Sequence, residues 1–198
     1  RAEFSSDGRH IAIGNGGFFR LFDVTSGKFL SMVKAGGGDM GIFSVPGTDD
    51  VAVSFGQDVG FWKFSTGEKL RGIENPVIAS EYKVAMSPDG KRFAVAGGFP
   101  VETVSVFEMS DLSRSHYFSR DAGKIMSLSF DPAGLKLVVT GSQEVDVWPI
   151  RGNSTASAAV IFPAGDGQGI EVSSCAVSPD ATKLLCRKGG CLRLFSLP

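Results

Sequence analysis

Histidine and tryptophan are scarce in this sequence. Its 198 residues contain two of each, and the histidines are His10 and His116. Nucleophilic hydrolysis needs a base within hydrogen-bond reach of a serine or cysteine, and imidazole is the usual base. The Gly-x-Ser-x-Gly motif that exposes a nucleophilic serine is also missing. We therefore predict that the chain is not an enzyme and that both histidines are solvated surface residues.

An excess of basic residues is absent as well. The chain has 20 Lys and Arg against 21 Asp and Glu, a formal net charge of −1. Binding to nucleic acid without sequence preference draws most of its affinity from phosphate neutralisation by a basic stripe. The longest uncharged stretch, which contains residues 154–165, is too short and too mixed to span a bilayer. Neither nucleic acid nor membrane is expected as a direct partner.

Cysteine occurs only three times, as Cys175, Cys186 and Cys191. An odd, small number favours a reducing compartment over a disulfide framework, so we expect an intracellular protein of the nucleus or cytoplasm. Cys186 and Cys191 flank a short turn on strands that we predict to be adjacent. Buried free thiols are the expected state, and a disulfide between these two is the alternative.

No cofactor or metal is expected. The glycine-rich residues 36–41 lack the following helix and the Lys-Ser or Lys-Thr pair of a phosphate loop. Asp166 stands alone where calcium needs several oxygen ligands. Cys186 and Cys191 do not form a Cys-x-x-Cys pair.

The sequence does contain one motif that is repeated five times: an Asp- and Gly-rich turn, an apolar strand, and a second strand that ends in an aromatic residue. The copies are FSSDGRHIAIGN from Phe4, VPGTDDVAVSF from Val45, MSPDGKRFAVAGG from Met86, FDPAGLKLVVTGS from Phe130 and VSPDATKLLCRKGG from Val177. The aromatic anchors predicted from this pattern are Phe22, Phe64, Phe107, Trp148 and Phe195, spaced by 42, 43, 41 and 47 residues. A strand-like repeat of this length indicates a β-propeller with one blade per repeat.

The predicted fold is therefore all-β, with about five four-stranded blades. Within residues 103–107 the apolar side chains alternate, as in a pleated strand. The repeats are predicted at residues 1–35, 36–76, 77–122, 123–165 and 166–198. The last repeat ends after its expected third strand, so we expect one or more blades upstream of Arg1 and a larger, seven-bladed ring.

These residues resemble the WD40 family. The turns FSSDG, SPDGK and SPDAT precede the second strand, and LFD, VWP and LFS end the third. The resemblance covers nearly the whole chain, but the family's Gly-His pair is missing and its Trp-Asp pair survives only as Phe22-Asp23. Within the family, three segments of this sequence are similar to the C-terminal propeller of the spliceosome-associated U-box ubiquitin ligase. They are residues 23–33, 124–148 and 191–197. That resemblance implies a protein-docking domain of the pre-mRNA splicing machinery, with ligase activity in a domain absent from this chain.

The turns between the second and third strands lie together on one side of a propeller, commonly the docking side. Phe99 and Pro100 form the strongest candidate anchor, because an aromatic residue in an open turn is a natural hot spot, although Phe99 folded against its own blade is an equal alternative. We expect Phe99→Ala to weaken partner binding without unfolding the chain. The predicted partner-binding residues are Asn15, Phe18, Gln57, Phe99, Pro100, Gln143 and Lys188.

Two functions remain open from the sequence. The first is a non-catalytic scaffold that binds other proteins of a multisubunit complex. The alternative is a propeller enzyme or a TolB-like ligand-binding propeller, which also repeats SPDGK. Upstream sequence separates them, since further repeats favour the scaffold and a signal peptide favours the alternative.

Overall fold

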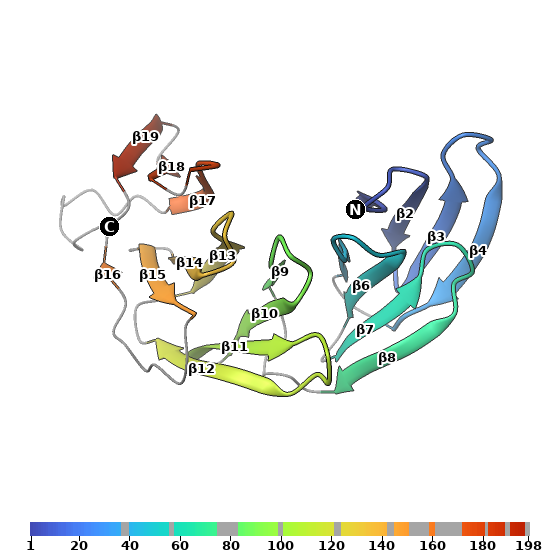
Figure 1. Cartoon of the computed structure of the whole chain (residues 1–198), viewed down its shortest axis with the longest axis horizontal. Coiled ribbons are helices and arrows are strands. Elements are labelled where there is room, and N and C mark those ends of the chain that lie inside the picture. The colour runs from blue at the N-terminus through green and yellow to red at the C-terminus, as the bar shows by residue number, and fades with distance from the viewer. Residues whose placement is uncertain are drawn as a thin grey trace.

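The structure of the chain consists of β-sheets arranged in an open arc (Figure 1). The computed structural model describes residues 1–36, 40–55, 58–74, 83–98, 101–120, 124–141, 145–150, 159–160, 172–180, 182–188 and 191–196. Within these ranges, no helix has the length and apolar character needed to cross a membrane.

Each sheet is a propeller blade whose antiparallel strands follow chain order from the inside of the arc to its outside. The first blade is β1 (Ala2–Phe4), β2 (His10–Asn15), β3 (Phe18–Asp23) and β4 (Phe29–Lys34). The second is β5 (Met40–Ser44), β6 (Asp50–Phe55), β7 (Asp58–Lys63) and β8 (Lys69–Glu74). The third is β9 (Lys83–Met86), β10 (Arg92–Gly97), β11 (Glu102–Glu108) and β12 (Arg114–Arg120). The fourth is β13 (Ile125–Phe130), β14 (Lys136–Gly141), β15 (Val145–Pro149) and β16 (Ala159–Val160). The fifth, with three strands among the described residues, is β17 (Val172–Val177), β18 (Lys183–Lys188) and β19 (Cys191–Ser196).

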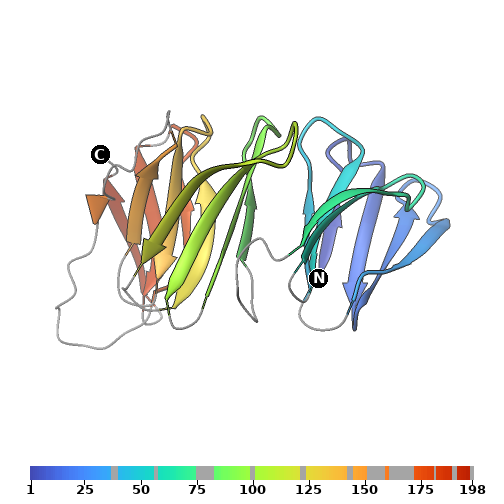
Figure 2. The ribbon, with the colours of Figure 1, turned by 90° about the horizontal axis from the view of Figure 1, so that it is seen from below.

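Inner strands of successive blades contact one another, in the order β1, β5, β9, β13 and β17. The view at right angles to the first shows the strands of every blade crossing the thickness of the arc, so the turns lie on its two sides (Figure 2). The predicted all-β fold built from propeller blades is thus confirmed.

The same hydrogen-bonded turn joins the first and second strands of three blades. In the first blade Ser5 Oγ donates to Asp7 Oδ1 over 2.7 Å and accepts the His10 N–H over 2.9 Å. Ser87 and Ser178 repeat both bonds, with Asp89 and Asp180 as the acceptors. The Ser-x-Asp motif of the repeat therefore produces a local network in which the serine hydroxyl donates one hydrogen bond and accepts another.

Asp180 has the most perturbed pKa of these turn carboxylates. The Ser178 hydroxyl, followed by the Thr182 N–H and hydroxyl, lowers the pKa of Asp180 to about 2. A lowered folded-state pKa means that the stabilisation is present above the unfolded-state pKa and is lost as pH falls through the folded-state value.

We expect Ser178→Ala to raise the pKa of Asp180 toward its ordinary 3.8. NMR titration of the carboxyl carbons measures this shift, and the pKa of Asp89 in the same variant is the control. An unchanged pKa for Asp180 would contradict the assigned cause.

Strand register corrects one of the predicted aromatic anchors. Phe22 is the Cα partner of Ile11, and Trp62 occupies the same position opposite Val51, each just after a β-bulge. Phe107, Trp148 and Phe195 hold this position in the other blades. The prediction of Phe64 was wrong, because Phe64 lies two residues beyond the shared position.

Aromatic rings connect blades across their interfaces. Phe19 of the first blade meets Trp62 of the second edge-to-face with ring centroids 5.3 Å apart. Phe118 of the third blade stacks on Trp148 of the fourth at 4.5 Å. Clusters of buried apolar residues surround these rings, so burial and ring contacts between adjacent sheets supply the main cohesion of the arc.

Candidate docking surface

The turn between β2 and β3 carries two of the predicted docking residues, Asn15 and Phe18. Asn15 and Phe18 are Cα partners, and Gly16 and Gly17 between them have φ values of 61° and 84°. Two consecutive positive φ angles are those of a type I′ hairpin turn, which only glycine-like residues adopt at low cost. The Gly-Gly pair therefore closes a tight hairpin whose two ends carry an exposed amide and an exposed aromatic ring.

Neighbouring backbone holds this hairpin in place. The Gly17 carbonyl oxygen accepts the N–H groups of Ala35 and Gly36 over 2.9 and 3.2 Å. The Gly14 N–H, just before the turn, donates to the Arg1 carbonyl oxygen over 2.9 Å. A side chain on a turn fixed from both sides loses little conformational entropy when a partner binds, which favours its use as an anchor.

The outer strand adds a cation that turn composition does not indicate. Lys34, the last residue of β4, is the Cα partner of Phe18 and is exposed. The equivalent pair in the second blade is Asp58 and Glu74, and Glu102 pairs with Arg120 near this end of the third. These outer-strand positions were missed because only the strand register brings them beside the turn. The surface thus combines an amide, an aromatic ring and charges of both signs, which suits a protein partner.

The remaining predicted docking residues are placed as follows. Lys188 ends β18, where its Cα pairs with that of Cys191. Gln57, Phe99, Pro100 and Gln143 lie outside the described residues, so their grouping with Asn15 and Phe18 stays a prediction.

The histidine prediction needs correction. His10 is not a solvated residue, because its side chain is only 16% exposed and its Nδ1 lies 3.3 Å from Asp49 Oδ1 of the second blade. His116 is half-buried with its ring stacked on Phe118 at 6.1 Å. Both histidines belong to packed regions, and the pattern around them did not reveal the tertiary neighbours that cover them.

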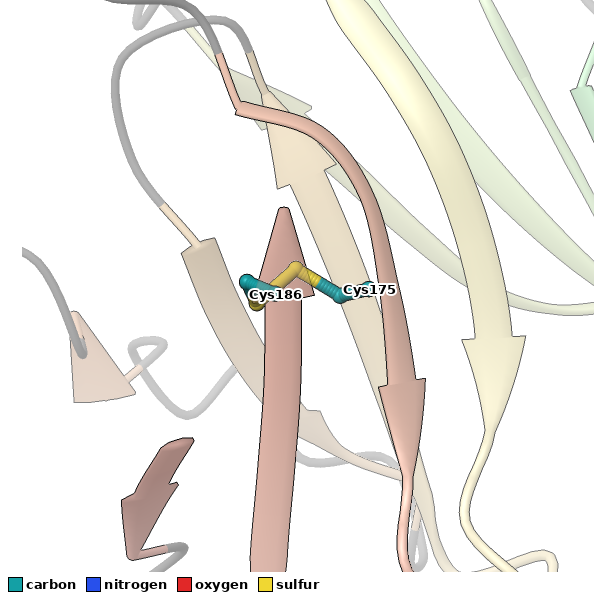
Figure 3. Close-up of a disulfide and its surroundings, with 2 residues drawn as sticks. All are labelled: Cys175 and Cys186. Carbon is teal, nitrogen blue, oxygen red and sulfur yellow. A yellow bond between two sulfur atoms is a disulfide. The ribbon is translucent and has the colours of Figure 1, made fainter. Parts of the chain in front are cut away.

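The prediction of buried free thiols was wrong. Cys175 and Cys186 are Cα partners on β17 and β18 and form a disulfide across the fifth blade (Figure 3). Cys191, on β19, is an exposed free thiol. The alternative, a Cys186–Cys191 disulfide, was based on the short turn between them, but register places Arg193 opposite Cys186. Closeness in sequence was a poor guide because partners in a sheet are set by strand pairing.

The described part of the chain brings no metal-binding cluster together. It holds no cluster of three or more His, Cys, Asp or Glu side chains that would bind a metal ion. His10 faces a carboxylate of a neighbouring blade. His116 stacks on Phe118, and its Nδ1 lies 3.1 Å from the hydroxyl oxygen of Ser115, which itself donates to the Val106 carbonyl over 3.3 Å. Binding by shape and charge is the chemistry that these residues support.

Comparisons with known proteins identify the fold. No protein-family model matches the chain, and no curated protein matches its sequence. A solved structure described as the complex of KlAtg21 with the coiled-coil of AgAtg16 matches over 100% of this chain and 66% of that chain, with a TM-score of 0.77 and 14% identity. The fold is a WD40-like β-propeller.

This similarity concerns the fold alone. The chain spans just under two thirds of the Atg21 neighbour's length. In all, 1342 chains of solved structures match, so the propeller by itself does not single out one function. The comparisons give no support to the resemblance to the U-box ligase or to a splicing context.

Proposed function

We propose that this propeller is a non-catalytic scaffold that docks other proteins within a multiprotein complex. The observation that carries the proposal is the exposed Phe18 on a hairpin fixed from both sides, next to Asn15 and Lys34. The Atg21 neighbour was solved with a coiled-coil partner, which supports protein partners for this kind of fold.

The finer proposal is that the complex is part of the pre-mRNA splicing machinery and that the protein works in the nucleus or cytoplasm. It is supported by the three sequence segments that resemble the U-box ligase propeller, at residues 23–33, 124–148 and 191–197. Purifying the full-length parent protein from its own cells, with mass spectrometry of what accompanies it, tests this context. Splicing components at stoichiometric amounts would support it, and a different stable assembly would keep the scaffold while removing splicing.

One observation favours the alternative of an exported, TolB-like ligand-binding propeller. The Cys175–Cys186 disulfide fits an oxidising compartment better than the cytosol. Trapping the thiols of the parent protein with an alkylating reagent in intact cells separates the two. Reduced Cys175 and Cys186 would support the intracellular scaffold, and a complete disulfide would support export.

Phe18→Ala is expected to weaken partner binding by about 30-fold, the effect of removing an interface hot spot worth about 2 kcal/mol. Phe18 is 36% exposed, so the loss of global stability should be smaller than for a fully buried ring. Titration of the identified partner against the full-length parent and its variants measures the effect.

Phe29→Ala is the matched control, since Phe29 is an exposed phenylalanine of the same blade at the far end of β4. The two variants should therefore differ in binding and agree in stability. Equal affinity of Phe18→Ala and Phe29→Ala would remove Phe18 as an anchor.

A further inference from the structure

A histidine and a carboxylate face each other across the interface between the first and second blades. His10 begins β2, and Asp49 lies in the turn between β5 and β6. Their closest atoms, His10 Nδ1 and Asp49 Oδ1, are 3.3 Å apart, and the side chains are 16% and 31% exposed. Both atoms are buried, and neither forms a hydrogen bond with a described residue. Each of the two atoms therefore depends on the other to compensate for its loss of water.

The protonation state of the imidazole decides whether this contact is attractive. A neutral ring with its proton on Nε2 turns the Nδ1 lone pair toward a carboxylate oxygen, so two acceptors face each other. A neutral ring with its proton on Nδ1 donates a hydrogen bond without a charge. The imidazolium donates from Nδ1 and adds a positive charge, and such a charge-assisted bond is about twice as strong.

Two carboxylates of the first blade also act on this ring. Asp23 ends β3 as the Cα partner of His10, and Asp7 lies in the turn before β2. The pKa of Asp7 is lowered first by the Arg9 N–H, and less strongly by the charge of His10. The pKa of Asp23 is lowered first by the Ser26 hydroxyl, and again less strongly by His10. Both carboxyls therefore stay ionised over the pH range in which imidazole side chains change charge.

The other charged side chains that adjoin His10 and Asp49 in sequence already have partners. The Nε of Arg9 lies 3.6 Å from Asp7 Oδ2, and both side chains are largely exposed. In the second blade, Asp50 forms an ion pair with Lys63 at 3.2 Å. Protonation of His10 thus adds an attraction across the interface that neither of these pairs supplies.

The position of His10 is equivalent to the first residue of the second strand in every blade. The other blades carry aspartate, arginine or lysine there, and these residues are Asp50, Arg92, Lys136 and Lys183. Arg92 likewise connects two blades, since its guanidinium donates to Glu108 of its own blade over 2.9 Å and to the Ile150 carbonyl of the fourth over 3.4 Å. Among these side-chain types, imidazole is the one that ordinarily changes charge between about pH 5 and pH 8.

We propose that the His10–Asp49 contact is a pH-sensitive latch between the first and second blades, closed when His10 is protonated. The protonated ring forms an ion pair across the interface, and the neutral ring leaves the buried Nδ1 and Oδ1 atoms poorly compensated. Because the closed interface takes up a proton in preference to the open one, its stability is greater at low pH. This stabilisation is lost as pH rises through the range in which His10 releases its proton.

Thiol labelling of the full-length parent measures the opening of this interface. Ala12→Cys places a probe two residues beyond His10, in the apolar cluster shared with the second blade. Ala94→Cys places one two residues beyond Arg92, in the cluster shared with the fourth. Both alanines are 0% exposed, and Cys191→Ser removes the exposed native thiol. Each probe is alkylated at about pH 7.5 and about pH 5.5, which bracket the ordinary imidazole titration. The ratio of the two labelling rates cancels the pH dependence of thiol reactivity.

We expect labelling of Ala12→Cys relative to Ala94→Cys to fall about threefold on acidification, the effect of one partly exposed ion pair. A buried thiol reacts only when the structure around it opens, so a closed latch slows the reaction. His10→Gln, which is neutral at both pH values, should make the ratio independent of pH. His10→Arg, which is charged at both, should also remove the pH dependence.

A ratio that stays constant with His10 in place would overturn the latch. A pH dependence that persists in His10→Gln would overturn it too, because another group would then be responsible. If Ala12→Cys prevents folding, urea unfolding of the parent protein and of His10→Gln at the same two pH values makes the comparison without a probe. Acidification should then stabilise the parent relative to His10→Gln, and equal changes in both proteins would exclude the latch.

Discussion

Phe93→Ala is expected to destabilise the propeller by about 3–5 kcal/mol, the cost of removing a fully buried aromatic ring. Phe93 is 0% exposed and lies between two other rings. The Phe61 ring of the second blade meets it edge-to-face at 5.4 Å, and the Phe107 ring of its own blade stacks on it at 5.1 Å. The substitution therefore removes buried area, two ring contacts and the centre of one blade interface together. Urea unfolding of the parent protein measures the change.

Phe29→Ala is again the control for side-chain size. Its ring is exposed, and among the described residues it touches a single other ring, that of Phe22, at 5.7 Å. We expect a loss below about 1 kcal/mol for this variant, as for most exposed positions. Similar unfolding midpoints for Phe93→Ala and Phe29→Ala would contradict the view that ring packing between blades holds the arc together.

Asp131→Ala is expected to cost about 2–3 kcal/mol, because it leaves two backbone donors without their acceptor. Asp131 occupies the turn position that holds serine in the first, third and fifth blades, and it is almost completely buried. Its Oδ1 accepts the Leu135 N–H over 2.6 Å and the Lys136 N–H over 2.8 Å. Thermal or urea unfolding of the parent protein reports the loss.

Asp131→Ser provides the matched comparison. Ser87 at the equivalent position accepts one N–H, that of Arg92, so serine should restore the bond to Lys136 and leave only Leu135 unsatisfied. The stability of Asp131→Ser should fall between wild type and Asp131→Ala. If alanine and serine destabilised equally, the carboxylate bonds would not be the cause.

The turn chemistry and the blade repeat were predictable because they are local. A serine two residues before an aspartate bonds to its own backbone wherever the chain places it, as Ser5, Ser87 and Ser178 do. Alternation of apolar residues likewise sets which side chains face a neighbouring sheet before that sheet is known. The second blade shows the limit, since its shared aromatic is Trp62 and only strand register separates it from Phe64.

The candidate docking surface was partly predictable. Gly16-Gly17 between two strand-like segments indicates a tight hairpin, so exposed side chains at Asn15 and Phe18 follow from the sequence. Lys34 joins them only through the pairing of β3 with β4, which depends on a bulge between Leu21 and Phe22. A bulge shifts every later pair by one residue, and composition does not locate it.

The sequence by itself determined that this chain forms one small β-sheet per repeat and that its turns are held by hydrogen bonds to nearby backbone. Those properties depend on neighbours within a few residues. Tertiary structure decided which groups from distant parts of the chain meet. It paired Cys175 with Cys186 across two strands, and it placed His10 against Asp49 of the next blade. These outcomes depend on register and on the packing of one sheet against another, and both are settled by apolar burial summed over whole blade faces.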